Sequence, residues 1–349
     1  MKGNPTPEHF VDPGSSSLLD GTGSQSTLPK SVSGGTGGGG ETLCHQPFGA
    51  SLEPVLRSVC GGRLSKISWF RTDWQRGGAL TGYASYVCDD GIERLAVVKL
   101  PVPPRERFWL TYLQKMPNVV PHLWAHGESL SGYDMAWLVM ERLTHGPLGS
   151  AWHGNQFDLI IEAVGRFYRA ADEVPIQSPA AEKDWHAIYD LARKGVQRHA
   201  LVDEQRWNKL LKKTHRKLKE WLKIWHERAV DKRCHGDLHL ANAMTRLPPP
   251  QGPALLLDFA MTGPGHWVED AVYFEHLYWS HRDKLGDRRL CRQMAHERKR
   301  HGLKVDDDWS RLAQVKRALL AMSTPAQRDL ASDPHHAQAA LQLLEAEVG

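Results

Sequence analysis

The stretch of sequence that decides the fold runs from Cys234 to Asp258 and reads C-H-G-D-L-H-L-A-N-A-M-T-R-L-P-P-P-Q-G-P-A-L-L-L-D. It places Asp237 near its start, Asn242 five residues later, and Asp258 directly after three leucines. The leucines predict a short buried strand that carries Asp258, and the prolines and glycine before them predict a turn. The stretch therefore presents two carboxylates and one amide in a fixed order.

These three side chains match what phosphoryl transfer requires of a protein, which is positioning and neutralisation of charge. One carboxylate must accept or orient the proton of the attacking hydroxyl, and Asp237 is the candidate for this catalytic role. An amide oxygen and a second carboxylate must hold Mg²⁺, a hard cation that takes oxygen ligands. Asn242 and Asp258 are the candidate metal ligands.

The motif H-G-D-L-H-L-A-N, followed by L-L-L-D-F, resembles the catalytic and metal motifs of the aminoglycoside phosphotransferase and choline kinase family. That family shares the protein-kinase-like fold, whose signature is H-R-D with an Asn five residues after the Asp, and then D-F-G. Gly236 stands where protein kinases usually carry Arg, and Ala260 replaces the last Gly of D-F-G. Both departures favour small-molecule kinases. The resemblance implies a two-lobed α+β fold, with a small antiparallel β-sheet lobe that carries one helix and a larger, mostly helical lobe.

The length allows one two-lobed domain or two ordinary ones. The 349 residues are 41% hydrophobic, which supports a sizeable core, and the net charge of +4 is too small to argue for a nucleic-acid partner. No membrane span and no signal peptide are expected. The five cysteines are scattered without C-x-x-C spacing, which favours reduced thiols, a cytoplasmic location and no metal cluster. The oligomeric state stays open.

Three regions are expected along the chain. Residues 1–45 include S-V-S-G-G-T-G-G-G-G and little apolar patterning, so they predict a disordered Gly/Ser-rich tail. A phosphate loop is not expected in that tract, since no strand precedes it and no helix follows it directly. Residues 46–140 are expected to form the N-terminal ATP-binding lobe, and residues 141–349 the C-terminal catalytic and substrate lobe.

The region 64–100 is β-rich and carries glycines between its first two expected strands. The expected strands lie near Ile67–Phe70, at Tyr83–Cys88 and at Ile92–Leu100, with Asp89–Gly91 as a hairpin turn. The segment R-G-G-A-L-T-G lies between the first two expected strands. Its glycines Gly77, Gly78 and Gly82 would let backbone N–H groups approach triphosphate oxygens. The segment is not G-x-G-x-x-G, so its main support is its place upstream of a candidate lysine.

That lysine is Lys99, at the end of L-A-V-V-K-L, which resembles the V-A-I-K strand of kinases where the ammonium pairs with phosphates. The alternative is an edge-strand lysine that prevents aggregation. A helix is expected after the next prolines, with Glu106, Leu110 and Leu113 on one buried stripe. A buried carboxylate needs a cation, so Glu106 is the candidate partner of Lys99, or alternatively a charge at the helix N-terminus.

The segment Ala136–Leu143 predicts a last apolar strand that leads into a connector. In the resembling family this connector is the hinge between the lobes, where adenine bonds to backbone groups. The resemblance thus implies that Met140, Glu141 and Arg142 line the adenine edge. Backbone contacts leave little side-chain signature, so the donor residue stays open.

The rest of the chain is expected to be mostly helical, with a first large helix from Phe157. A long basic helix is expected at about Asp203–Ala229. Its basic face could bind an anionic membrane or a partner, or it could simply be solvated while a tryptophan stripe is buried; the second interpretation is favoured. The stretch F-A-M-T-G-P-G-H-W-V-E-D resembles the family segment in which a second aspartate starts a helix, which implies that Asp270 caps that helix or braces the catalytic loop. His235 is expected to hydrogen-bond the backbone of that loop.

Together these motifs predict an ATP- and Mg²⁺-dependent kinase that phosphorylates a hydroxyl of a small metabolite or an aminoglycoside-like acceptor. The basic C-terminal half disfavours a polycationic acceptor and favours a neutral or anionic one. The alternative is a catalytically weak nucleotide-binding regulatory protein of the same fold, against which the intact Asp237 argues. A protein kinase is not expected, since no A-P-E follows Asp258.

Overall fold

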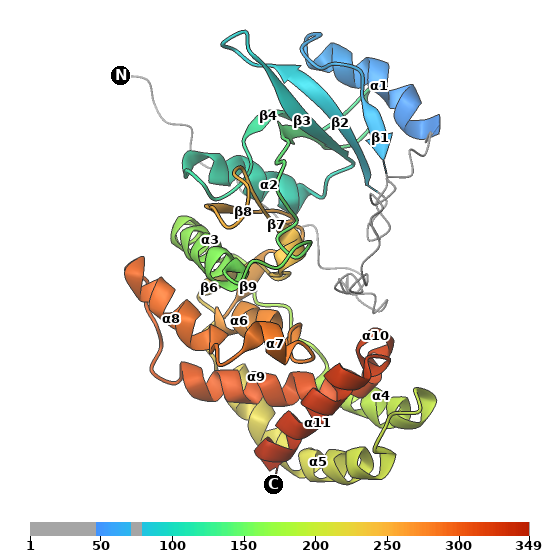
Figure 1. Ribbon diagram of the computed structural model, residues 1–349, viewed down its shortest axis with the longest axis vertical. Coiled ribbons are helices and arrows are strands. Elements are labelled where there is room, and N and C mark those ends of the chain that lie inside the picture. The colour runs from blue at the N-terminus through green and yellow to red at the C-terminus, as the bar shows by residue number, and fades with distance from the viewer. Residues whose placement is uncertain (1–46, 71–78, 349) are drawn as a thin grey trace.

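The computed structural model of the protein describes residues 47–70 and 79–348, and the statements below concern these residues. An antiparallel sheet with two helices forms one end of the molecule, and a helical body forms the other (Figure 1). The α+β class expected from the sequence is confirmed. The expected disordered tail and the candidate glycines Gly77 and Gly78 lie outside the described residues.

The sheet contains five strands in the described part of the chain, all antiparallel, in the order β1-β2-β3-β5-β4. Their bounds are β1 Ser68–Phe70, β2 Leu80–Val87, β3 Glu93–Leu100, β4 Leu123–Gly127 and β5 Trp137–Glu141. The hairpin between β2 and β3 turns at Gly91, whose φ of 76° suits glycine. The sequence did not reveal β4, because it is an edge strand with half-exposed side chains and no clear alternation.

The two faces of the sheet pack against different partners. Helix α1 (Pro47–Val59) belongs to a cluster with Ala96, Val98 and Leu100 of β3, which are all fully buried. The intervening residues of β3 point to the opposite face, because successive side chains of a strand alternate. Helix α2 (Pro104–Tyr112) and the 3-10 turn η1 (Leu113–Lys115) follow directly and join the larger core of the helical body. Lys99 therefore faces away from the α1 cluster.

The helical body begins after β5 and carries two short β-ribbons. Its helices are α3 Gln156–Ala171, α4 Trp185–Arg198, α5 Glu204–His226, α6 Val268–His276, α7 Arg282–Leu285, α8 Leu290–Arg300, α9 Trp309–Ser323, α10 Arg328–Ala331 and α11 Pro334–Val348, with 3-10 turns η2 Leu240–Asn242 and η3 Thr324–Ala326. Its strands are β6 Lys232–Cys234, β7 Ala243–Thr245, β8 Ala254–Leu256 and β9 Gly263–Gly265. No helix within the described ranges combines the length and the apolar character needed to cross a bilayer.

Two helices of this body bear directly on the sequence predictions. The tryptophan stripe of α5 is buried, with Trp207, Trp221 and Trp225 all at most 7% exposed, so the expectation of a solvated face over a core stripe is confirmed. The sequence did not reveal α4. Its buried stripe is narrow and includes Trp185 and Tyr189, whereas most of its remaining surface is polar.

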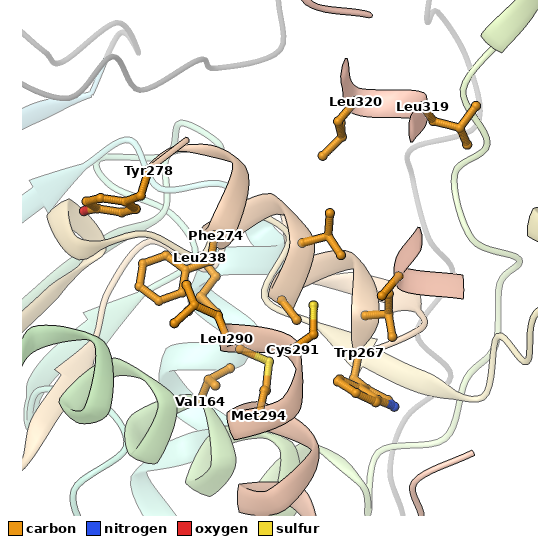
Figure 2. Close-up of a cluster of buried hydrophobic side chains, with 14 of the residues drawn as sticks. Val164, Leu238, Trp267, Phe274, Tyr278, Leu290, Cys291, Met294, Leu319 and Leu320 are labelled. Atoms are coloured by element: carbon orange, nitrogen blue, oxygen red, sulfur yellow. The ribbon is translucent and has the colours of Figure 1, made fainter. Parts of the chain in front are cut away.

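The core of the helical body holds the catalytic loop in place. Figure 2 shows Leu238, from the loop after β6, beside Phe274 of α6 and Leu290 of α8. These three side chains are fully buried. Burying a leucine or phenylalanine side chain contributes about 1.5–3 kcal/mol each. The loop that carries Asp237 is therefore anchored to the core by the residue that follows it.

Candidate functional site

The β7–β8 ribbon brings Asn242 and Asp258 together. Strand β7 pairs with β8 in the register Ala243 to Leu256, and the Leu257 N–H donates to the Asn242 carbonyl at 2.9 Å. Asp258 lies one residue beyond that pair. Its φ of 58° is a left-handed conformation, which is uncommon outside glycine but tolerated by Asp. The predicted strand before Asp258 is present as β8, and it ends at the site.

Asp237 is buried, with 6% of its surface exposed, and its carboxylate is held from three sides. The Tyr273 hydroxyl donates to Oδ1 at 2.8 Å, and the Asn242 amide nitrogen donates to Oδ2 at 3.1 Å. His239 Nε2 lies 3.4 Å from Oδ2. Burial alone would raise the pKa of Asp237, but the contacts with His239 and Tyr273 outweigh it and place this pKa below the ordinary value. The carboxylate is therefore ionised at neutral pH.

Gly236 cannot be replaced by a residue with a side chain without moving the chain. Its φ is 84°, and a Cβ added there would lie 2.3 Å from the Met261 carbonyl oxygen. Backbone of the segment after Asp258 thus packs directly on the catalytic loop. The H-G-D form of the motif follows from this close approach.

Asp270 and His235 brace the catalytic loop, as the sequence predicts. The buried carboxylate of Asp270 accepts the backbone N–H groups of His235 at 2.7 Å and Gly236 at 2.9 Å, and the Tyr168 hydroxyl at 2.9 Å. His235 Nε2 lies 3.0 Å from the Leu257 carbonyl oxygen, which ties the loop to the end of β8. Burial raises the pKa of Asp270 to about 6, against the lowering effect of these hydrogen bonds.

Replacing Asp270 by Asn should change how stability depends on pH. The folded-state pKa of about 6 lies above the ordinary 3.8, so the unfolded chain releases its proton first and wild-type stability falls as pH rises through this window. The variant lacks this contribution, so its stability relative to the wild type should rise by about 3 kcal/mol across the window. Urea unfolding of both proteins at several pH values measures it. A pH-independent difference would contradict the assignment.

Lys99 of β3 and Glu106 of α2 form an ion pair in which the ammonium contacts both carboxylate oxygens. The Lys99 ammonium lies 2.6 Å from Oε1 and 2.8 Å from Oε2 of Glu106, which is 2% exposed. Burial lowers the pKa of Lys99, but the negative charges of Glu106 and Asp258 outweigh it and raise this pKa above the ordinary value. The charge of Asp258, which follows β8, thus acts on the ion pair between β3 and α2.

The candidate adenine edge lies at the end of β5. The Glu141 N–H donates to the His122 carbonyl at 2.7 Å, and the Arg142 N–H donates to the Leu95 carbonyl at 3.0 Å. These two N–H groups are thus used inside the protein. An adenine at this edge would have to use other backbone groups of the segment. Met140 is 8% exposed and pairs with β3.

Gly82 was expected in the loop between the first two strands, and the structure corrects this prediction. Gly82 lies inside β2, opposite Trp69 of β1 and Val98 of β3. A Cβ added there would lie 2.4 Å from Cγ2 of Ile67. Close packing between neighbouring strands explains a glycine at this position. In the sequence Gly82 looked like part of a glycine loop because it lies close to Gly77 and Gly78. A glycine within a strand adds no side chain to the alternating pattern that would reveal the strand.

Sequence reasoning did not identify Tyr273 as a site residue. Its hydroxyl reaches Asp237 across 36 positions in sequence, because α6 packs against the catalytic loop. The one available signal was its place one helical turn after Asp270, which already faces that loop. His239, whose ring also lies near Asp237, carries no sequence signal of its own beyond its place in the H-G-D-L-H motif.

Comparisons with known proteins agree with this fold. The family model described as Phosphotransferase enzyme family matches residues 86–315, about two thirds of the chain. A candidate aminoglycoside phosphotransferase from Ralstonia eutropha JMP134 is similar in structure, with a TM-score of 0.52 and 12% identity, over 84% of this chain and 98% of that one. Spectinomycin phosphotransferase APH(9)-Ia, solved with ADP and spectinomycin, gives a TM-score of 0.51 and 10% identity, over 85% and 93%.

A search of curated protein sequences found no match to this chain. The two structural likenesses show the fold, which is that of the aminoglycoside phosphotransferases. The family model covers both the candidate lysine and the catalytic loop. The chain therefore belongs to the phosphotransferase enzyme family.

Proposed function

We propose that the protein transfers the γ-phosphoryl group of ATP, with Mg²⁺, to a hydroxyl of a small molecule. The observation that carries this proposal is the meeting of Asp237, Asn242 and Asp258 at one end of the β7–β8 ribbon, beside the Lys99–Glu106 ion pair. These groups supply a base, two oxygen ligands and a phosphate-binding cation. Phosphoryl transfer needs little more than these.

Asp237 would orient the acceptor hydroxyl and accept its proton. Its carboxylate is ionised at neutral pH, and the Tyr273 hydroxyl and the Asn242 amide fix its orientation. A base held in this way needs no rearrangement at the moment of transfer. Tyr273 acts as a positioning residue in this proposal.

The residues at the candidate metal site fit Mg²⁺. The Asn242 amide nitrogen donates hydrogen bonds to the backbone oxygen of Asp237 at 3.0 Å and to the Asp237 carboxylate. The amide oxygen, Oδ1, is therefore the atom left to bind a cation. The half-buried carboxylate of Asp258 supplies a second oxygen. A hard cation prefers such ligands. When bound, Mg²⁺ would neutralise charge on the phosphates of ATP.

The two parts of the chain would have different roles in this reaction. Residues 46–140 would form the ATP-binding lobe, in which Glu106 holds Lys99 in place to contact the phosphates. Residues 141–349 would form the catalytic and substrate lobe. Met140, Glu141 and Arg142 lie at the junction, where adenine would bind.

Replacing Asp258 by Asn should weaken Mg²⁺-dependent nucleotide binding by roughly 10–100-fold or more, because a ligand is lost at the metal. Calorimetric titration with a non-hydrolysable ATP analogue, with and without Mg²⁺, measures this. Asp307→Asn is the matched control, since Asp307 is exposed. Wild-type protein that binds the analogue without any dependence on Mg²⁺, or an Asp258→Asn variant that binds like the wild type, would contradict the proposal.

A further inference from the structure

A stripe of polar side chains on α6 leads away from the proposed catalytic carboxylate, and beyond Tyr273 it has no part in the proposed mechanism. Glu269, Tyr273 and His276 occupy positions i, i+4 and i+7 of α6, so they share one stripe of that helix. Tyr273 donates its hydroxyl to Asp237, and its ring stacks with that of His276 at a centroid distance of 6.1 Å. The stripe therefore connects the site of phosphoryl transfer with its surroundings on α6.

Two lysines from other elements reach this stripe. Lys316 of α9 is 7% exposed, and its ammonium lies 5.4 Å from the ring centroid of Trp185 and 4.6 Å from that of Trp225. The ammonium of Lys183, which precedes α4, lies 6.0 Å from the same Trp185 ring. Lys316 and Arg228 both lie over the Trp225 ring, and Arg228 pairs with Glu269, so Lys316 lies near the same stripe of α6. Burial first, and then His336 and the positive charges of both lysines, hold the pKa of His276 well below its ordinary value. Lys183, Lys316 and His276 are therefore treated as one neighbourhood.

The polar atoms of this neighbourhood lack partners. Between residues 47 and 348, outside the gap at 71–78, no carboxylate lies within 4.0 Å of the Lys316 ammonium and no hydrogen bond reaches it. The Trp185 indole N–H, both ring nitrogens of His276 and Nε2 of His336 are buried without a hydrogen-bond partner. Some nine in ten buried polar groups in proteins are hydrogen-bonded. The Trp185 indole N–H is a donor, and one nitrogen of the neutral His276 ring is another, so the neighbourhood holds unpartnered donors that an acceptor of hydrogen bonds would satisfy.

The charges in this neighbourhood favour an anion as that acceptor. Arg228 is buried and pairs with Glu182 at 2.9 Å and with Glu269 at 3.1 Å, so both carboxylates already have a cation. Lys183 and Lys316 add two positive charges that no described carboxylate approaches within ion-pair distance. Burial lowers the pKa of Lys316 to about 8, while Glu269 acts in the opposite direction, so its ammonium stays largely charged at neutral pH.

We propose that Lys183, Lys316 and the Trp185 indole N–H bind an anionic group, a carboxylate or a phosphate, of the acceptor whose hydroxyl lies at Asp237. An anionic oxygen accepts hydrogen bonds and donates none, so it is complementary to ammonium and indole groups, which only donate. This inference rests on the proposed function and assigns its substrate class. The acceptor is then a hydroxy acid or a sugar phosphate.

Matched acceptors test this assignment with ADP release from ATP and Mg²⁺ as the readout. Each set shares a hydroxylated skeleton and differs in one group: glycerol, glycerate and glycerol phosphate; glucose, gluconate and glucose 6-phosphate. We expect kcat/KM for one anionic member to exceed that of its neutral counterpart at least tenfold, roughly the effect of one charge-assisted hydrogen bond. The carboxylate and phosphate arms distinguish the two sources of the anion. A neutral or polycationic acceptor that outperforms every anion overturns the proposal.

Variants Lys316→Met and Lys183→Met test the residues, and Lys212→Met on the exposed face of α5 is the matched control. Lys316→Met and Lys183→Met should each raise KM for the anionic acceptor roughly tenfold or more. Their kcat and their binding of the ATP analogue should stay close to wild type. The control should change nothing. If Lys316→Met lowers the melting temperature but leaves acceptor preference unchanged, Lys316 serves only to neutralise Glu269, and the proposal is wrong.

A binding measurement separates this proposal from the proposed function. With ADP and Mg²⁺ present, glucose 6-phosphate or gluconate should raise the melting temperature of the wild type, glucose should not, and Lys316→Met should abolish the effect. This outcome upholds the anion site even if no turnover is found. Wild-type protein that binds nucleotide but is stabilised by none of these anions overturns the anion site alone. Protein that shows neither Mg²⁺-dependent nucleotide binding nor turnover contradicts the proposed function instead.

Discussion

Replacing Asp237 by Asn is expected to reduce kcat by roughly 10²–10⁴-fold, the usual contribution of a general base, and to leave nucleotide binding nearly unchanged. Asn has almost the same shape as Asp, and the Tyr273 hydroxyl and the Asn242 amide already hold that position. The folded structure should therefore survive, whereas the proton of the acceptor hydroxyl loses its base. ADP release measures turnover, and titration with a non-hydrolysable ATP analogue measures binding.

The control for this variant is Asp307→Asn, which makes the same chemical change at an exposed position. It should retain wild-type turnover. Normal turnover by Asp237→Asn would show that this carboxylate has no part in the reaction. Loss of nucleotide binding together with turnover would instead indicate that Asp237 supports the fold of the site.

Replacing Lys99 by Met is expected to abolish measurable turnover and to destabilise the protein. The substitution removes the phosphate-binding cation, and it leaves Glu106 as a buried carboxylate near Asp258 without a partner. Removing one partner of a buried pair costs about 3–5 kcal/mol. Lys99 is partly exposed, so the lower end of that range is expected for the free energy of unfolding. Urea unfolding and ADP release measure the two effects.

A double variant separates the structural role of this ion pair from its role in catalysis. Lys99→Met with Glu106→Leu removes both charges, so most of the lost stability should return, while turnover should not. Lys66→Met is the matched single control, because Lys66 is an exposed lysine that precedes β1 of the same sheet. Recovery of turnover in the double variant would mean that Lys99 serves stability alone.

The parts of the fold that the sequence revealed are those with a strong local pattern. The hairpin from β2 to β3 was predictable because Asp89, Asp90 and Gly91 separate two apolar runs. The Lys99–Glu106 pair was predictable because Glu106 falls on the buried stripe of α2, where a carboxylate needs a cation. The resemblance implied a cap or a brace for Asp270, and the structure shows the brace.

The remaining features depend on tertiary contacts that leave little local signal. The contact of Tyr273 with Asp237 exists because α6 packs on the loop after β6. Gly82 is required by the distance between β1 and β2 at Ile67, which no sequence pattern encodes. The unpartnered donors around Lys316 come from α4, α6, α9 and α11, so they become visible only when these helices are packed together.

The most direct test of the central claim is ADP release from ATP and Mg²⁺ in the presence of small hydroxyl-bearing acceptors, with Asp237→Asn as the blank. The panel consists of sugars, sugar acids, sugar phosphates, amino alcohols, hydroxy amino acids and aminoglycosides. We predict acceptor-dependent ADP release that requires Mg²⁺ and disappears in the blank. Release that is equal in wild type and Asp237→Asn, or a wild type that neither releases ADP nor is stabilised against heat by Mg²⁺ and ATP, would contradict the assignment as a small-molecule kinase.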